Sequence, residues 1–259
     1  MLMAIDVGNT NTVIGLYEGE ESRAQWRLQT MRQRTSDEYA VAVVQLMQFK
    51  GFQPEDVKAV VMATVVPQVV FPMRKMFRDH FGVQVLVVGE DLDYGMPIAL
   101  NNPSEVGADR VVNAVAAWKR YARPLIIVDF GTATTFDVVD GEGVYRGGAI
   151  APGINLSIEA LHQAAAQLPR IGIERPEHVI GTSTVTAMQS GVFYGYVALI
   201  EGLITRIRQE FGAPMKVVAT GGLAGLFSMA VPMIEQVDRD LTMTGLVDIY
   251  RRNPPPSQD

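Results

Sequence analysis

The N-terminal part of the chain alternates short apolar runs with polar loops, which predicts three strands followed by alternating helices and strands. The stretch from Thr35 to Glu38 (TSDE) is a capping box, in which a hydroxyl and a carboxylate satisfy free amide donors at the start of a helix. This helix is expected to run to about Lys50 and to end at Gly51. The other expected elements are strands at Met1–Ile5, Val13–Tyr17, Arg23–Thr30, Val57–Thr64 and Val83–Val88, and a helix at Val69–Phe81.

The same order of patterns recurs in the second half of the chain. Three apolar strands are expected at Leu125–Val128, Thr134–Val139 and Val144–Ile150, and a helical region opens at Pro152-Gly153. Further helix over Thr184–Phe211, a strand at Lys216–Thr220 and a last helix at about Thr242–Arg252 follow. Internal repetition is evidence about architecture. We therefore expect two duplicated α/β lobes, 1–121 and 122–259, joined near Tyr121–Pro124.

Each half contains a loop of small polar residues behind one carboxylate: DVGNTNTV at 6–13 and DFGTATT at 129–135. Glycine lets the backbone approach a ligand closely, and amide and hydroxyl side chains donate hydrogen bonds to phosphate oxygens. A carboxylate repels phosphate, so its natural role is to hold a cation or a cation-bound water. Counting from the two aspartates pairs Asp6 with Asp129, Gly8 with Gly131, Asn9 with Thr132, Asn11 with Thr134 and Thr12 with Thr135.

Two loops of this kind, one per lobe, predict that both grip the polyphosphate of one nucleoside triphosphate in a cleft between the lobes. A tight hairpin whose Asn and Thr side chains satisfy only their own backbone is the structural alternative. The Walker A pattern does not occur in the sequence, so the expected cradle differs from the P-loop.

Composition narrows the function classes. A net charge of −6 argues against a nucleic-acid surface, and the absence of cysteine excludes disulfides and thiolate chemistry. The N-terminus lacks a basic leader, and apolar stretches such as Val57–Val70 are too short to cross a bilayer. We expect a soluble cytoplasmic protein.

Asp109 lies at the head of a predicted helix that carries Val111, Val112, Ala114 and Val115. Taken alone, a carboxylate at this position is best explained as a first-turn residue stabilised by the helix dipole, with Arg110 as its ion-pair partner. The guanidinium of Arg110 also offers planar donors to an anion.

The paired loops resemble those of the acetate and sugar kinase, heat-shock ATPase and actin superfamily, whose lobes are ribonuclease H-like with mixed sheets flanked by helices. More narrowly, the chain resembles type III pantothenate kinases. The segments that carry this resemblance are DVGNTNTV at 6–13, GADRVVNAV at 107–115, DFGTATT at 129–135, GGAIAPGI at 147–154, TVTAMQSG at 184–191 and ATGGLA at 219–224. Together they span nearly the whole chain.

The resemblance implies ATP-dependent phosphorylation of pantothenate to 4'-phosphopantothenate, the first step of coenzyme A biosynthesis, with Mg²⁺ and a monovalent cation (K⁺ or NH₄⁺). It also implies a homodimer that completes the substrate pocket. It assigns ATP to Asp6, Val7, Gly8, Asn9, Thr10, Asn11, Thr12, Val13 and Thr132, and the monovalent cation to Asp129. It assigns to Asp109 the role of general base, which takes the hydroxyl proton during phosphoryl transfer. It assigns pantothenate to Leu100, Gly107, Ala108, Asp109, Arg110 and Thr184, with Arg110 binding either the substrate carboxylate or the migrating phosphoryl group.

One position departs from the family pattern, since Leu100 stands where the family often has a tyrosine that lines the substrate site; Tyr94 is a candidate to compensate. Gly221-Gly222 has two interpretations, as an approach to adenine or as a plain turn. Two other functions stay open: a kinase or phosphatase of the same superfamily with another hydroxylated substrate, and a non-catalytic regulatory accessory factor.

Overall fold

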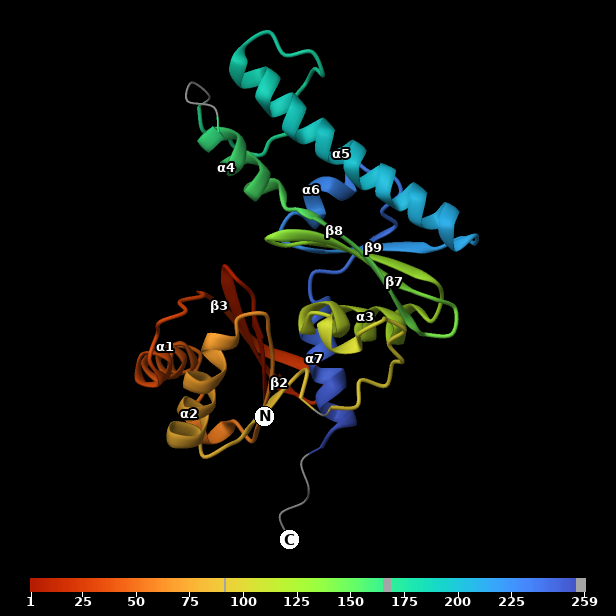
Figure 1. The fold of residues 1–259 in the computed structure, drawn as a ribbon. Helices are drawn as coiled ribbons and strands as arrows, with labels where there is room; N and C mark the ends of the chain where they lie inside the picture. Colours follow the sequence, from red (N-terminus) through yellow and green to blue (C-terminus); the bar gives the residue numbers. More distant parts are fainter. Residues whose placement is uncertain (91, 165–168, 255–259) are drawn as a thin grey trace. The chain divides into compact units, whose positions relative to one another are not determined.

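The computed structural model describes residues 1–90, 92–164 and 169–254 (Figure 1). Contacts within the chain define two compact units. The first contains Met1–Arg120 and the C-terminal segment from Asp240, and the second contains Tyr121–Arg239.

The first unit is built on a five-stranded mixed sheet with the order β3-β2-β1-β4-β5. Its first three strands form an antiparallel meander, whereas β4 and β5 add to β1 in parallel. Tight turns join the antiparallel strands, and helical crossovers lead to the parallel ones. The bounds are β1 Leu2–Val7, β2 Asn11–Glu18, β3 Glu21–Gln29, β4 Ala59–Thr64 and β5 Val85–Val87.

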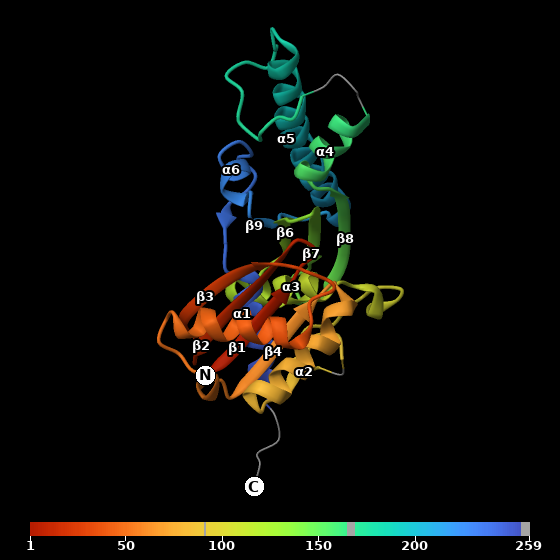
Figure 2. The same ribbon diagram turned by 90° about the vertical axis from the view of Figure 1, so that its left-hand side faces the viewer.

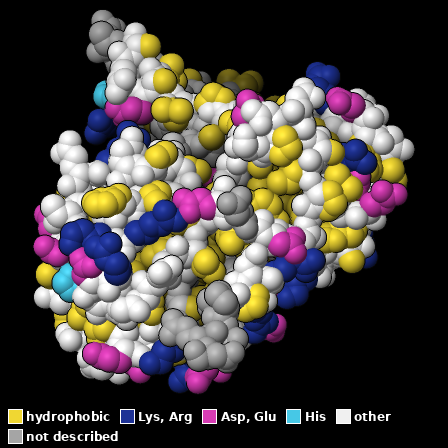
Figure 3. Space-filling view, turned by 60° about the horizontal axis from the view of Figure 1, so that its bottom comes forward, with side chains coloured by type: hydrophobic (Ala, Val, Ile, Leu, Met, Phe, Trp, Pro, Cys, Tyr) yellow, Lys and Arg dark blue, Asp and Glu magenta, His cyan; other side chains and the backbone are white. Residues whose placement is uncertain are grey.

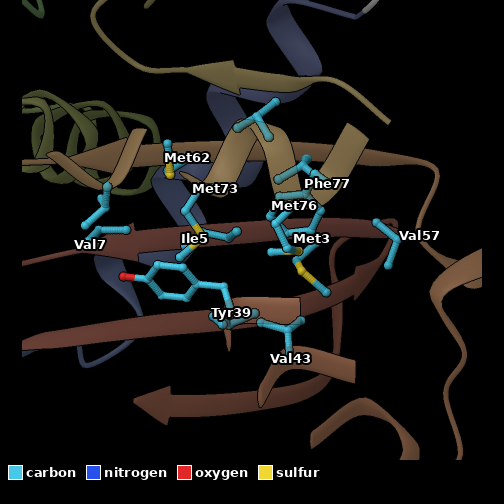
Figure 4. Close-up of a cluster of buried hydrophobic side chains, with 14 of the residues drawn as sticks. Met3, Ile5, Val7, Tyr39, Val43, Val57, Met62, Met73, Met76 and Phe77 are labelled. Atoms are coloured by element: carbon cyan, nitrogen blue, oxygen red, sulfur yellow. The ribbon is translucent and has the colours of Figure 1, made fainter. Parts of the chain in front are cut away.

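Helices cover both faces of this sheet. On one face α1 (Ser36–Gln48) and α2 (Val70–Phe81) bury the odd-numbered β1 side chains Met3, Ile5 and Val7, together with Tyr39 and Phe77 (Figures 2 and 4). The expected capping box is confirmed, because the Thr35 and Glu38 side chains each bond the other's backbone amide.

On the other face, α3 (Ala108–Tyr121) and α7 (Leu241–Arg252) pack on the even-numbered positions Leu2 and Ala4. The two helices approach closely, since a Cβ built on Gly245 would lie 2.2 Å from the Val112 carbonyl oxygen. The final helix of the chain therefore completes the core of the first unit.

The second unit repeats this sheet, with the order β10-β9-β6-β7-β8. β6, β7 and β8 form an antiparallel meander, and β9 and β10 add to β6 in parallel, as β4 and β5 add to β1. The bounds are β6 Leu125–Phe130, β7 Ala133–Val139, β8 Tyr145–Pro152, β9 Lys216–Gly221 and β10 Gln236–Val237.

Three helices accompany the second sheet: α4 (Ile154–Ala164), α5 (Thr184–Phe211) and α6 (Ala224–Ser228). By length and composition alone α5 could cross a membrane. Of its most apolar window 33% is buried, and Phe193, Tyr196, Ile200 and Ile204 of α5 pack in one cluster with Ile126 and Val128 of β6.

Short 3₁₀ helices occupy three connections: η1 Pro54–Asp56, η2 Pro67–Val69 and η3 Pro103–Glu105. Positively and negatively charged side chains are interspersed and do not form separate patches on the face shown in Figure 3. On the face in Figure 3, Lys and Arg side chains lie among Asp and Glu side chains. Several are paired, as in Arg252 with Asp93 at 2.9 Å and Lys119 with Asp248 at 2.5 Å.

The predicted α/β class with two duplicated mixed sheets is confirmed, because the two strand orders match element by element. The division at residue 121 differs from the contact units in one respect. The helix at 241–252, expected in the second lobe, belongs to the first unit, because its apolar face packs on β1 and β4.

Candidate functional site

The first candidate phosphate loop lies at the carboxyl end of β1. Asp6 pairs in register with Val13 of β2 and with Ala63 of the parallel strand β4. The Gly8 amide donates to the Asn11 carbonyl at 3.0 Å, and this bond closes the turn. Asn9, Thr10 and Asn11 are exposed, whereas Val7 and Thr12 are buried. The loop therefore presents polar side chains to solvent on a rigid, buried base.

Thr30, just after β3, braces this loop from the side. Its hydroxyl donates to the Gly8 carbonyl at 2.8 Å and lies 2.9 Å from the Thr12 hydroxyl, while its amide donates to the Thr10 carbonyl at 2.9 Å. Two residues on, Arg32 Nη2 donates to Asn9 Oδ1 at 3.2 Å. Sequence reasoning missed both residues, because no local pattern marks them and only the strand register brings them to the loop.

The second candidate loop lies at the carboxyl end of β6 and has the same construction. Asp129 pairs with Thr135 of β7 and with Thr220 of the parallel strand β9. The Gly131 amide donates to the Ala133 carbonyl at 3.1 Å, as Gly8 does in the first loop. Thr132 is exposed at the tip of the turn.

Two glycines pack against this second loop and leave no room for a side chain. A Cβ on Gly153 would lie 2.2 Å from the Thr132 carbonyl oxygen. Gly221 has φ +90°, and its Cβ would lie 2.6 Å from Asp129 Oδ1. The positive φ fits a plain turn, and the absence of a side chain at Gly221 leaves the room that the Asp129 carboxylate occupies.

The strand register corrects part of the residue matching between the loops. Asp6 pairs with Val13, seven positions on, whereas Asp129 pairs with Thr135, six positions on. The first loop thus contains one residue more, so Thr12 corresponds to Thr134, not to Thr135. Counting along the sequence missed this extra residue, because only the pairing shows where each loop ends.

The corrected match shows that both units contain a buried pair of hydroxyl groups at the start of the strand that follows the loop. Thr12 and Thr134 are both buried, with 0% and 1% of their surface exposed. The Thr12 hydroxyl contacts the Thr30 hydroxyl, and the Thr134 hydroxyl contacts the Tyr196 hydroxyl from α5. In each unit, a buried hydroxyl pair fixes the first residues of the returning strand to another element.

Asp109 lies in the first turn of α3 and is partly buried. Its Oδ1 accepts a hydrogen bond from the Arg110 amide at 2.8 Å. Burial raises the pKa of the Asp109 carboxyl above its ordinary value, and the Arg110 amide and guanidinium only partly oppose this rise.

Gly107 lies directly against this carboxylate. A Cβ built on Gly107 would lie 2.6 Å from Asp109 Oδ1, so the glycine leaves the space that the carboxylate occupies. The Gly107 carbonyl also accepts from the Arg110 and Val111 amides and starts the helix.

Leu100 lies in the long connection between β5 and α3 and is partly buried. Long irregular connections in compact domains often serve function. The end of α7 anchors this connection: Asn253 Oδ1 accepts from the Asp93 amide at 2.8 Å, and Asn253 Nδ2 donates to the Asp93 carbonyl at 2.9 Å. Nearer α3, Asn102 holds the turn before Gly107 by accepting from the Ser104 amide and hydroxyl.

Thr184 is exposed at the first position of α5, and it lines an apolar groove of about 750 Å³ between α4 and α5. The other lining residues include Ile154, Leu161, Met188, Val192 and Tyr196. Thr184 therefore belongs to the same unit as Asp129 and Thr132 but lies at this groove, away from the second loop.

The first unit thus contains the predicted loop from Asp6 to Val13, Leu100, and the segment from Gly107 to Arg110. Asp6 projects from the face of the sheet that α3 covers, the helix whose first turn carries Asp109. The second unit contains Asp129, Thr132 and Thr184.

The described residues contain no group of three or more His, Asp or Glu side chains placed to hold a metal ion. A cation at either loop would depend on one carboxylate with backbone carbonyls and the ligand's own oxygens.

A family model described as type III pantothenate kinase matches residues 2–206. A type III pantothenate kinase from Rhodospirillum rubrum is 57% identical over 98% of this chain and 100% of its own length. One from Caulobacter vibrioides is 52% identical over 98% of each chain. The chain belongs to the type III pantothenate kinase family. This confirms the family inferred from the motifs.

Solved structures share the fold of this pantothenate kinase family member at low sequence identity. A conserved protein from Campylobacter jejuni, assigned to the Baf family of transcriptional activators, matches with a TM-score of 0.62 at 18% identity, over 97% of this chain and 98% of that one. The activator of 2-hydroxyisocaproyl-CoA dehydratase from Clostridium difficile, with bound ADPNP, matches with a TM-score of 0.53 at 14% identity, over 96% and 92%. At these identities the likeness concerns the fold alone.

Proposed function

We propose that this protein transfers the γ-phosphoryl group of ATP to the primary hydroxyl of pantothenate and forms 4'-phosphopantothenate, the first step toward coenzyme A. The observation that carries this proposal is full-length identity above one half to type III pantothenate kinases. The two matching acid-tipped loops and the Asp109 carboxyl with its raised pKa support it. No observation favours the regulatory accessory factor or another substrate of the same superfamily.

In the proposed mechanism the loop from Asp6 to Val13 binds the polyphosphate of ATP, and Thr132 is a further ATP-binding residue. Exposed Asn9, Thr10, Asn11 and Thr132 donate hydrogen bonds to phosphate oxygens. The buried strands and the Thr30 brace beneath the first loop keep these donors in place before ATP arrives, which lowers the ordering cost of binding.

Asp109 takes the proton of the pantothenate hydroxyl as the oxygen attacks phosphorus. A raised pKa makes the ionised carboxylate a stronger base than an ordinary aspartate, and general-base help is typically ~10²–10⁴-fold in rate. Arg110 binds an anion beside it, either the substrate carboxylate or the transferring phosphoryl group. Leu100, Gly107 and Ala108 line the proposed pantothenate pocket, where Leu100 supplies an apolar wall without a phenolic hydroxyl.

Two cations complete the proposed site. Asp129 would hold a monovalent cation, K⁺ or NH₄⁺, and Mg²⁺ would bind with the ATP phosphates. Their chemistry is neutralisation of charge on the phosphate oxygens. The residues of this chain orient the reactants and handle the proton.

We further propose a cytoplasmic homodimer in which a second copy covers the groove between α4 and α5. The groove is apolar, and its surroundings carry exposed large side chains: Leu156 at 52%, Val179 at 64%, Ile180 at 84% and Val185 at 42%. Exposed apolar patches of this kind mark interaction surfaces. Thr184 on this groove would then contribute to a pocket completed across the dimer.

The test is ADP release with ATP and pantothenate, measured with and without K⁺ or NH₄⁺, for the parent and for Asp109→Asn. We expect pantothenate-dependent turnover that rises with the cation. Asp109→Asn should bind both substrates and lose at least about 100-fold in kcat, since the base is removed while its shape is kept.

Hexoses and acetate serve as alternative acceptors in the same assay. Turnover with one of them but not with pantothenate would replace the substrate assignment. Parent-like turnover by Asp109→Asn would remove Asp109 from the role of base.

A further inference from the structure

The segment after β3 runs along the first phosphate loop and carries two arginines that differ in environment. Thr30 ties the start of this segment to Gly8 and Thr10. Arg32, two residues on, therefore lies at the tip of the loop, where its Nη2 donates to Asn9 Oδ1 at 3.2 Å. The position of Arg32 beside Asn9 is thus set by the same contacts that brace the loop.

Arg34 is turned away from the loop. Its Nη2 donates to Met31 Sδ at 3.0 Å, and its guanidinium lies 5.3 Å from the centre of the Tyr39 ring. Tyr39 is a fully buried member of the α1 and α2 core. Arg34 is accordingly a packing residue at the start of α1.

Arg32, in contrast, is exposed and contacts a neutral amide. Among residues 1–90, 92–164 and 169–254 it makes no ion pair with a carboxylate. Other arginines of this unit do: Arg23 pairs with Glu18 at 2.7 Å at the far end of β3, and Arg252 pairs with Asp93. The charge of Arg32 is therefore available to an anion at the loop.

The chemistry of the loop calls for such a charge. Residues 6–13 contain one carboxylate and no basic side chain, so the loop offers a polyphosphate only neutral donors. Stabilising the spread negative charge of the phosphates is the main demand of phosphoryl transfer. A guanidinium meets this demand with a planar set of donors that matches phosphate oxygens.

The contact with Asn9 also has a direction. A guanidinium has no acceptor, so Asn9 must present its Oδ1 to Arg32, and its Nδ2 then points away from Arg32. Both Nδ2 hydrogens are left for phosphate oxygens at the tip of the loop. Arg32 thereby sets which side of the Asn9 amide meets the ligand.

We propose that Arg32 is a phosphate-binding residue of the first loop, which contacts the polyphosphate and orients the Asn9 amide toward it. This inference rests on the proposed function, because it takes the loop from Asp6 to Val13 as the ATP site. It adds a cationic residue that lies outside the loop in sequence.

Equilibrium binding of ATP, ADP and adenosine to the full-length parent, Arg32→Ala, Arg32→Lys and Arg23→Ala tests the role of Arg32. Arg32→Ala should weaken ATP binding about tenfold to a hundredfold, the usual range for a lost hydrogen bond to a charged group. ADP should weaken as well, and adenosine should be unaffected. Arg32→Lys should recover part of the loss, and Arg23→Ala should match the parent.

A smaller dependence of ATP affinity on salt in Arg32→Ala would support a direct phosphate contact, which a purely structural role would not produce. ATP binding by Arg32→Ala within about twofold of the parent would overturn the inference, as would an equal loss for adenosine.

Failure of the proposed function gives a different result. If the parent binds ATP but does not phosphorylate pantothenate, the substrate assignment fails while the Arg32 effect on ATP stands. If the parent binds no ATP at all, both proposals fail.

Discussion

At the residue scale, the buried carboxyl of Asp109 opposes the stability of the fold. Burial raises its pKa above the ordinary 3.8, so the folded state binds this proton more tightly than the unfolded chain. As pH rises through 3.8 the unfolded chain releases the proton first, and the folded state loses stability until its own raised pKa is passed. The ionised carboxylate therefore destabilises the fold at neutral pH.

Asp109→Asn should for this reason have a Tm equal to or above that of the parent at pH 7, although it is inactive. The amide oxygen keeps an acceptor for the Arg110 amide and carries no charge to bury. Thermal unfolding at pH 7 and near pH 3.5 measures the difference, which should shrink at the lower pH. A Tm well below the parent at pH 7 would mean that the carboxylate stabilises the helix start instead.

Gly107→Ala should displace the same carboxylate without unfolding the protein. The new Cβ would meet Asp109 Oδ1, the end of a flexible side chain, so the carboxylate moves and the backbone does not. Displacement by about 1 Å can cost about 100-fold in kcat. Steady-state kinetics should show lowered kcat with KM for ATP nearly unchanged.

The matched control for this variant is Gly141→Ala. Its Cβ would meet only Pro124, at an ordinary 3.6 Å. Equal kcat values for Gly107→Ala and the parent would show that the glycine does not position Asp109.

The local structure around single residues was predictable where a local pattern indicates it, as in the turns that follow Asp6 and Asp129 and in the capping box at Thr35. Thr30, Arg32 and Tyr196 were not predictable, because they reach the loops through strand register and helix packing. The same limit explains the one-residue error in matching Thr12 with Thr135. The strand pairing shows that Thr12 and Thr134 occupy equivalent positions in the two units.

At the element scale, the two sheets are copies of one plan. In each, an antiparallel meander starts with the strand that carries the loop aspartate, and two parallel strands extend the sheet on the other side of that strand. Loops at the carboxyl ends of neighbouring parallel strands meet at one edge. This places Thr64 beside Val7, and Gly221 beside Phe130.

The close approach of α3 and α7 gives a test of packing. Gly245→Ala would press a methyl group onto the Val112 carbonyl, which is backbone and cannot turn aside, so we expect a loss of about 1–3 kcal/mol in the free energy of unfolding. Gly202→Ala, within α5, meets nothing within 4 Å and should gain about 0.5–1 kcal/mol from helix propensity.

Urea unfolding of the two variants measures both changes. Both variants replace glycine by alanine. Opposite signs of the change in unfolding free energy therefore separate the effect of close packing from that of helix propensity. A stabilised Gly245→Ala protein would contradict the tight contact between α3 and α7.

Most long elements were predictable from periodicity, including the final helix at about 242–252. The short elements α6 and β10 were missed, because they are too brief to show a period. Sequence patterns also did not reveal where the last helix packs, since an amphipathic face indicates burial but not the partner. That information lies in the fit of Gly245 to Val112 and of Met243 to Gly15.

At the scale of the whole molecule, the groove between α4 and α5 is the surface that a second copy would cover. Ile180 lies in the segment leading into α5 and is 84% exposed. Ile180→Glu should place a charge in the proposed interface and shift the protein from dimer to monomer. Sedimentation of the parent and the variant measures the change.

Phe71→Glu provides the control, because Phe71 is also an exposed apolar residue, at 74%, but lies on α2 of the first unit. It should leave the dimer intact. A monomeric parent, or an equal effect of both substitutions, would refute the groove as the interface.

The discontinuous first unit has a consequence for synthesis. During synthesis β1 and β4 are made early, but α7, which covers Leu2, Ala4 and Val61, follows only after the whole of residues 121–239. Until then one apolar face of the first sheet lacks the helix that buries it, whereas the second unit, residues 121–239, has been synthesised in full. A chain that terminates shortly before residue 240 should therefore be aggregation-prone and dependent on chaperones, and it should not be an active truncated enzyme.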